Sequence, residues 1–295
     1  MRAQKQAGKE IPSRLQALIA WLMALVAVVA SELVVSVVAA LLALHSGLSL
    51  ERAIALISDP HGSPLYSSTP WILSLTVANE LALAFTLLIW VARNRPHIGH
   101  VLPIGRPTLR IVFGGLLIVF GFGPLAEFAG ELVYRRVLPD LTAERMVLQI
   151  SRDASPGELL LVLCVCALLP ALVEEAMFRG LITRAFERGS HRVMVLVPSV
   201  LFALSHLEPT QVAGTFVLGI AFGLVRLYGG SLIPCMIAHA AYNASVILAE
   251  RFIGPGEHVL YYGRVGIGLG VAALGTLLMV SSPGQLLAVL PRRHN

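Results

Sequence analysis

Long apolar segments recur along the whole chain, and they constrain its fold more than any other feature. A helix needs about 20 mainly apolar residues to cross a bilayer, and windows of this kind give about eight candidate spans. Of the 295 residues, 56% are hydrophobic and only 13% are charged, whereas soluble domains carry about a quarter charged residues. We therefore expect an all-α fold, a polytopic membrane bundle of about eight transmembrane helices. The windows lie near residues 15–44, 71–92, 111–133, 159–183, 194–206, 212–228, 231–250 and 262–280.

The basic residues indicate how the chain is oriented. A net charge of +5 could suggest nucleic acid, but the lysines and arginines lie in short segments between apolar windows, where they orient helices in a bilayer. With the N-terminus inside, fourteen of the 22 fall on the inner side and seven on the outer side, and Arg179 lies within a span. We expect an integral protein of a bacterial inner (plasma) membrane with both termini cytoplasmic. The lipid bilayer is then a partner and nucleic acid is not.

Two long connections and two glycine pairs complete the expected architecture. Residues 46–70 are rich in Pro, Gly and Ser, and residues 134–158 are mixed in charge, so both are expected to be loops. Small residues four apart let membrane helices approach closely. The sequence has this spacing at two places, Gly219 with Gly223 and Gly266 with Gly270.

Three polar clusters interrupt the apolar windows. Glu174 and Glu175 are followed by Arg179, while Phe202 precedes His206 by four residues, as His239 precedes Asn243. An ionisable group within a bilayer costs several kcal/mol, so such groups usually face a cavity, pair with one another and mark function. At ~1.5 Å per residue, Glu174, His206 and His239 lie roughly 15, 20 and 14 Å from the inner surface. Because these depths are similar, we expect one polar intramembrane cavity.

Helical spacing predicts different partners for the two glutamates. Neighbours on a helix point about 100° apart, whereas residues four apart share a face, so Glu175 is expected to pair with Arg179. Glu174 then projects towards other helices, unless Arg179 neutralises both acids and merely holds the helices together. Pro170, four residues before Glu174, could kink this helix and free a backbone carbonyl.

The clusters contain the groups needed for hydrolysis. A buried carboxylate can take a proton from water, an imidazole can orient that water or protonate the leaving amine, and a His/Asn pair can donate hydrogen bonds to an oxyanion. A membrane-embedded histidine or asparagine can equally serve as an interhelical hydrogen bond. Their combination favours a membrane-embedded hydrolase.

The three motifs resemble those of the CPBP family, which comprises CAAX prenyl proteases and bacteriocin-processing enzymes, intramembrane peptidases of the Abi type. The motifs are E-E-x-x-x-R at Glu174–Arg179, F-x-x-x-H at Phe202–His206 and H-x-x-x-N at His239–Asn243. The resemblance implies that Glu174 and His206 activate water and that His239 and Asn243 form the oxyanion site. Glu175, Arg179 and Phe202 would support them.

The resemblance also bears on cofactors, because the family is described both as glutamate-type and as metal-dependent. Two histidines and a glutamate match the ligand count of a catalytic zinc site. The sequence lacks HExxH, and a His/Asn pair four apart suits hydrogen-bond donation better than zinc binding. We expect a metal-free mechanism, with a divalent metal, zinc, as the alternative.

The resemblance covers roughly residues 155–255 and divides the chain. We expect residues 1–150 to form N-terminal membrane helices, about three spans. The resemblance implies that residues 151–255 form the CPBP-type catalytic core, and we expect residues 256–295 to form the last span and a cytoplasmic tail. The expected activity is cleavage of a peptide bond in a membrane-associated protein or peptide. The sequence encodes no feature that selects prenylated substrates, a cleavage position or an oligomeric state.

Two other function classes remain open. Glu32, Glu80, Glu127 and Glu131 lie in or near apolar spans, and such acids can mark the ion pathway of a proton-coupled transporter. No inverted repeat relates the two halves, as it does in many transporters, and we expect Glu80 beside Asn79 to form an interhelical hydrogen-bond site. A non-catalytic membrane scaffold or immunity factor could use the same groove to bind a partner.

Overall fold

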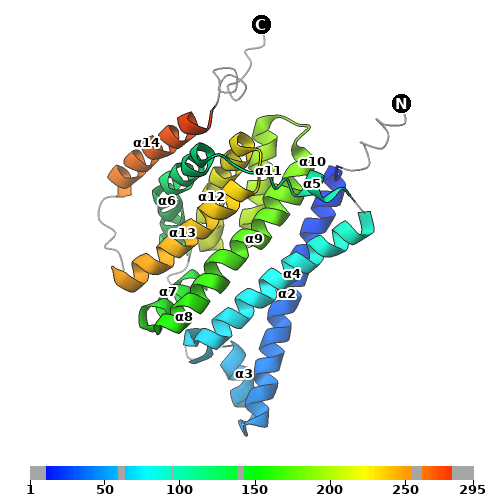
Figure 1. Ribbon diagram of the computed structural model, residues 1–295. Helices are drawn as coiled ribbons and strands as arrows, with labels where there is room; N and C mark the ends of the chain where they lie inside the picture. Colours follow the sequence, from blue (N-terminus) through cyan, green and yellow to red (C-terminus); the bar gives the residue numbers. More distant parts are fainter. Residues whose placement is uncertain (1–10, 59–63, 95, 138–142, 254–260, 281–295) are drawn as a thin grey trace.

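The chain folds into a bundle of helices (Figure 1). The computed structural model describes residues 11–58, 64–94, 96–137, 143–253 and 261–280, and these ranges contain helices and no strand. This confirms the predicted all-α membrane bundle. The first and last residues, on which the predicted orientation of the termini depends, lie outside the described ranges. The start of α2 and the end of α14 lie at the same end of the bundle (Figure 1).

Each predicted apolar window coincides with a helix. Five helices within the described residues are long and apolar enough to cross a membrane, namely Arg14–His45, Thr69–Asn94, Leu109–Val133, Pro156–Phe186 and Gln211–Gly229. The windows near 194–206, 231–250 and 262–280 form shorter or more polar helices, so the count of eight spans stays a prediction. The elements are α2 (Arg14–His45), α4 (Thr69–Asn94), α6 (Leu109–Val137), α11 (His191–Leu204), α12 (Pro209–Gly229), α13 (Ile233–Phe252) and α14 (Tyr261–Met279).

The fourth window is one continuous helix with two wider π-helical stretches, here called the composite helix. It runs from Pro156 to Phe186. Its parts are α8 (Pro156–Leu163), η2 (Cys164–Leu168), α9 (Leu169–Glu175), η3 (Ala176–Ile182) and α10 (Thr183–Phe186), of which η2 and η3 are π-helical.

The two predicted loops are not wholly loops, which corrects the sequence analysis. The first contains α3 (Leu50–Ser58) and a 3-10 turn at Pro64–Ser67, and the second contains α7 (Ala143–Asp153). α7 was missed because its charged face lowers its average hydropathy. Its other face packs Met146, Val147 and Ile150 into an apolar cluster with Trp71. A short helix, α5 (Ile98–Val101), was also not expected.

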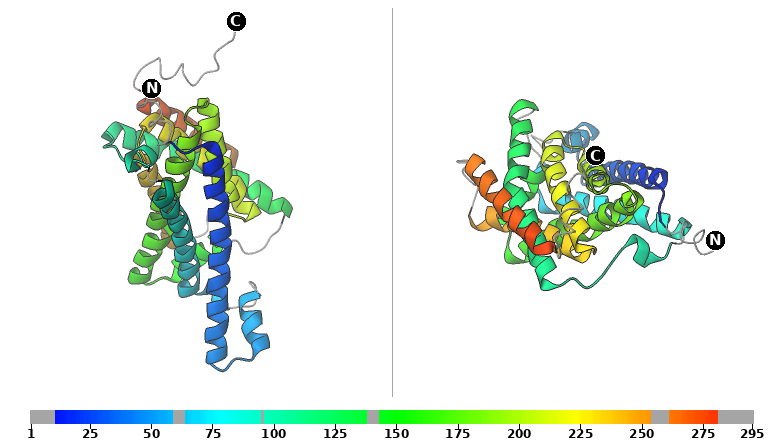
Figure 2. Two further views of the ribbon diagram at one scale, coloured as in Figure 1. Left: turned by 90° about the vertical axis from the view of Figure 1, so that its right-hand side faces the viewer. Right: turned by 90° about the horizontal axis from the view of Figure 1, so that it is seen from above.

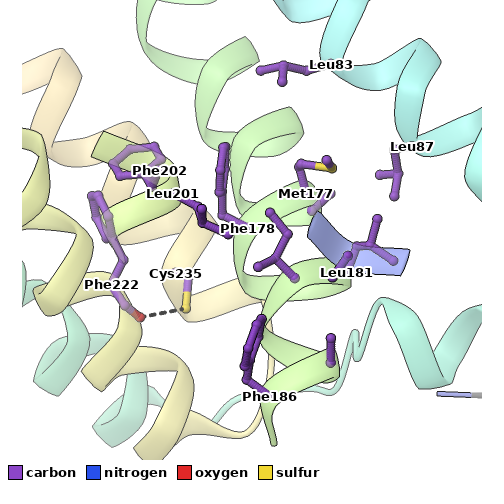
Figure 3. Packing of buried hydrophobic residues seen from close by; sticks show 14 of the residues in the cluster. Leu83, Leu87, Met177, Phe178, Leu181, Phe186, Leu201, Phe202, Phe222 and Cys235 are labelled. Carbon is purple, nitrogen blue, oxygen red and sulfur yellow. Dashed lines mark hydrogen bonds between the residues drawn. The ribbon is translucent and has the colours of Figure 1, made fainter. Parts of the chain in front are cut away.

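The helices form a body with one projecting arm. α2 packs along α4 and extends beyond the other helices, with α3 beside its far end (Figures 1 and 2). α6 contacts α12, α13 and α14, while α13 also contacts α9. A buried apolar core joins the composite helix to its neighbours through Leu83, Met177, Phe178, Phe202 and Phe222 (Figure 3).

Glycines set the closest helix contacts. A Cβ atom added at Gly219 would lie 3.0 Å from the Ser199 Cβ, and one added at Gly223 would lie 2.9 Å from Val195 Cγ1. The first predicted pair therefore does lie at a helix contact, between α12 and α11.

The helix contact predicted at Gly266 and Gly270 was wrong, since Cβ atoms added at these two glycines would meet no heavy atom within 4 Å. α14 instead meets α6 through Gly268 and Gly275. A Cβ at Gly275 would lie 2.6 Å from the Gly114 carbonyl oxygen, and one at Gly268 would collide with the Gly121 carbonyl oxygen. Glycines seven apart on two antiparallel helices make this contact, so a search for spacing of four selected the wrong face.

Gly268 and Gly270, two residues apart on opposite faces of α14, give a test of this packing. We expect Gly268→Ala to lower the thermal unfolding temperature in detergent, because the methyl group would force two backbones apart, at about 1–3 kcal/mol. Gly270→Ala is the matched control, and it should raise stability by about 1 kcal/mol because alanine favours the helix. Equal effects of both substitutions would contradict the assigned contact.

Candidate active site

The composite helix places the two glutamates between its π-helical stretches. It begins with a capping box, in which the backbone N–H of Glu158 donates to Ser155 Oγ and that of Ser155 donates to Glu158 Oε2. Pro170 has no N–H to donate, and the wider stretch η2 lies directly before it. The second stretch starts just after Glu175, and the Thr183 hydroxyl donates to the Phe178 carbonyl across it at 2.8 Å. Single-turn π segments recur at functional sites, and here two such stretches flank the segment α9 that carries both glutamates.

Glu175 binds two cationic or ionisable partners in the interior. Its Oε1 atom accepts a hydrogen bond from Arg179 Nη1 at 3.0 Å and lies 2.9 Å from His239 Nδ1. Both Glu175 and Arg179 have no exposed surface, and the predicted pairing between them is present. A carboxylate can only accept, so the His239 proton is on Nδ1. Glu175 therefore orients the imidazole, a role that spacing along one helix could not reveal.

Aromatic rings and backbone carbonyls surround Arg179. Its guanidinium lies 4.5 Å from the Phe202 ring centre and 5.0 Å from that of Phe222, and Nη2 donates to the Gly219 carbonyl at 3.1 Å. Cation–π contacts strengthen when the cation is desolvated, as this one is. Residues from the composite helix, α11 and α12 thus converge on one charge.

Glu174 faces the same imidazole from the other side. Its Oε2 atom lies 3.7 Å from His239 Nε2, and 13% of its side chain is exposed, against none of Glu175. Glu174 therefore does not share Arg179 with Glu175 but projects towards α13. Phe222 stacks on the His239 ring at 4.5 Å with an interplanar angle of 21° and so fixes the plane of the ring.

His206 joins this group through Phe202. The two rings meet edge to face at 4.9 Å, and the Phe202 ring also lies 6.2 Å from that of His239. His206 Nδ1 lies 3.0 Å from the Phe202 carbonyl oxygen, which places the ring proton on Nδ1 and leaves Nε2 as the acceptor nitrogen. The next residue, Leu207, has a φ of 57°, a conformation that non-glycine residues seldom adopt, and it turns the chain sharply after His206.

Asn243 lies one turn further along α13 than His239, beside η2. Its Nδ2 atom donates to the Cys166 carbonyl at 3.5 Å. Cys166 is four residues before Pro170, which has no N–H to satisfy that carbonyl. The structure therefore brings Glu174, Glu175, Arg179, Phe202, His206 and His239 together and places Asn243 at the adjoining, proline-interrupted turn. The roles of these residues stay predictions.

The donor set does not fit the zinc alternative. In the part of the chain that the structure describes, no three His, Cys, Asp or Glu side chains are placed to hold a metal ion. Both nitrogens of His239 face carboxylates instead.

Two structural supports lay outside the sequence motifs. Arg226 is 4% exposed, and its Nε donates to the Arg179 carbonyl at 3.2 Å while Nη2 contacts Glu187 Oε1 at 2.7 Å. Trp21 Nε1 donates to the Ser205 hydroxyl at 2.9 Å, beside His206. By sequence, Arg226 belongs with the cations of the inner side, because a single arginine near a helix end is typical of a membrane boundary. No spacing rule links Trp21 to a residue 184 positions away.

The buried pair gives a stability test. Arg179→Met should destabilise the protein by about 3–5 kcal/mol, because it leaves the Glu175 carboxylate buried without its cation. Combining it with Glu175→Gln should restore much of the loss, since no unpaired charge remains. Arg184→Met, at a half-buried pair with Glu187, is the control and should cost no more than about 1 kcal/mol. Thermal unfolding in detergent measures all three. A fully stable Arg179→Met protein would show that the pair does not hold the site.

Comparison with known proteins agrees with these motifs. Residues 156–245 match the sequence model of a family described as Rce1-like, "Type II CAAX prenyl endopeptidase Rce1-like". No curated protein and no solved structure matches the chain significantly. The matched segment begins at the start of the composite helix and ends two residues after Asn243, so it contains all three motifs. Residues 156–245 of this chain are therefore similar to this family, which confirms the resemblance to CAAX prenyl proteases that the motifs indicated.

Proposed function

We propose that this protein is a CAAX-type intramembrane endopeptidase in which Glu174 takes the proton from the attacking water. The observation that carries the proposal is the position of His239 between two acids, with Nδ1 at 2.9 Å from Glu175 and Nε2 at 3.7 Å from Glu174. Glu175 is paired with Arg179, whereas Glu174 is partly exposed and forms no ion pair with an arginine or lysine of the described residues. Glu174 is thus the acid available for chemistry.

The proposed reaction is a hydrolysis in which the proton taken from water is returned to the leaving amine. Glu174, assisted by His206 through its acceptor nitrogen Nε2, removes a proton from water while the water oxygen attacks the carbonyl carbon of the peptide bond. The Asn243 amide, and His239 when its Nε2 also carries a proton, donate hydrogen bonds to the resulting oxyanion, which is the usual means of stabilising such an intermediate. The proton then passes to the leaving amine as the carbon–nitrogen bond breaks.

The proposed substrate is a membrane-associated protein or peptide. Five helices of the described residues are long and apolar enough to cross a bilayer, and an active site within them meets substrates that enter through lipid. The matched family is described by cleavage of CAAX prenyl substrates. We therefore propose a C-terminal cysteine peptide carrying a prenyl chain as the first substrate to test, beside the same peptide without the chain.

The decisive experiment measures peptide cleavage by purified protein in proteoliposomes. We expect Glu174→Gln, His206→Ala and His239→Ala each to lower kcat by about 100-fold or more, as loss of acid–base or oxyanion groups usually does. Glu158→Gln is the matched control for the glutamate, because it lies on the same helix and glutamine can keep the capping box. His45→Ala, at the exposed end of α2, is the control for the histidines.

Undiminished cleavage by all three variants would show that Glu174, His206 and His239 are not the catalytic residues. If the intact protein cleaves nothing, and the Glu174→Gln protein keeps its biological activity, the scaffold or immunity-factor alternative gains support. Proton flux that depends on Glu80 and not on Glu174 would favour the transporter alternative.

A further inference from the structure

One buried acid outside the three motifs faces the composite helix. Glu80 of α4 is 5% exposed, and it lies on the same helical face as Thr76, Leu83 and Leu87, at spacings of four, three and four residues. This face packs on the composite helix, since α4 contacts α9 and η3. Figure 3 shows Leu83 and Leu87 beside Met177 and Leu181.

The packing places Glu80 on the face of α4 that meets the helix bearing Glu174. α4 and the composite helix run in the same direction (Figure 1). α4 contacts α9, the segment of 7 residues that carries Glu174. The buried carboxyl group of Glu80 therefore faces this short segment of the composite helix.

The contacts of neighbouring residues agree with this placement. Asn79, the adjacent residue, turns the other way, where Nδ2 donates to Glu32 Oε1 at 3.0 Å and Oδ1 accepts from the Ser31 hydroxyl at 2.8 Å. The expected interhelical hydrogen-bond site is thus present at Asn79. The Oε2 atom of Glu80 is buried and accepts no hydrogen bond from the described residues.

Electrostatics link Glu80 to the proposed base. Glu80 and Glu174 are close enough to interact electrostatically. Two carboxylates that interact across a low-dielectric helix interface repel each other, which favours a pair that retains one proton.

We propose that Glu80 is a positioning residue that carries the retained proton and donates it as a hydrogen bond to Glu174. This inference rests on the proposed function. Glu80 stays protonated throughout the reaction. Glu174 alone accepts the proton of the attacking water and returns it to the leaving amine, so no net proton is gained or lost. A neutral donor on α4 would fix the carboxylate of Glu174 and leave its second oxygen for water.

The test compares Glu80→Leu with Glu80→Gln in the peptide-cleavage assay. Leucine fills the site without a donor, so kcat should fall about 10-fold to 100-fold with KM unchanged, as misplacement of a reacting group does. Glutamine keeps a neutral N–H donor, and kcat should return to within about 3-fold of the wild type. Thr86→Val is the control, since Thr86 is a buried polar residue of the same helix whose hydroxyl bonds only within it, to Ala82.

A stability measurement separates this role from a structural one and does not depend on cleavage. Glu80→Leu should hold or raise the thermal unfolding temperature, because it removes an incompletely paired acid from an apolar face, while it lowers kcat. The unfolding-temperature shifts of Glu80→Gln and Glu174→Gln should not add in the double variant, because neighbouring groups couple.

The failures of the two proposals can be told apart. Wild-type kcat in Glu80→Leu, together with an inactive Glu174→Gln, overturns the role of Glu80 alone. Cleavage retained by Glu174→Gln overturns the proposed function, while the double-variant comparison still decides whether the carboxyl groups meet. If Glu80→Leu does not fold, strictly additive shifts of the two glutamine variants overturn the inference.

Discussion

The buried charge of Arg179 is the interaction on which the site depends. A desolvated guanidinium needs an anion, hydrogen-bond acceptors and polarisable neighbours. Here Glu175, the Gly219 carbonyl and the rings of Phe202 and Phe222 supply them. Because these partners come from three different helices, satisfying one charge fixes how the composite helix, α11 and α12 pack. His239 is then drawn into place by the same Glu175 oxygen.

Irregular backbone in the composite helix adds polar backbone groups beside the buried charges. Pro170 interrupts the hydrogen-bond ladder of the composite helix, and the Asn243 amide donates to the carbonyl of Cys166, four residues before it. Within a bilayer, such backbone groups are tolerated only where other protein groups or a cavity satisfy them. The stretch η3 is wholly buried and adjoins the polar side chains, whereas η2 contacts Asn243 on one face and carries the exposed residues Cys164 and Leu168 on another.

Most of the fold followed from hydropathy, and part of the site followed from spacing. The apolar windows each became a helix, and residues four apart paired as helical geometry requires at Glu175 and Arg179. α7 was missed because an amphipathic helix has low average hydropathy, and only packing against the Trp71 cluster shows which face is buried. The glycine contact of α14 was misassigned because spacing alone does not say which face of a helix meets a neighbour.

The sequence by itself determined that the chain is a membrane helix bundle and which polar residues share a helical face, because length, hydropathy and helical periodicity are local properties. The tertiary structure alone decided which helices face one another. That decision placed His239 between Glu174 and Glu175, brought Arg226 to the Arg179 carbonyl, and turned Glu80 towards the composite helix. These contacts join residues up to about a hundred positions apart, and their energies depend on packing and desolvation that no single helix carries.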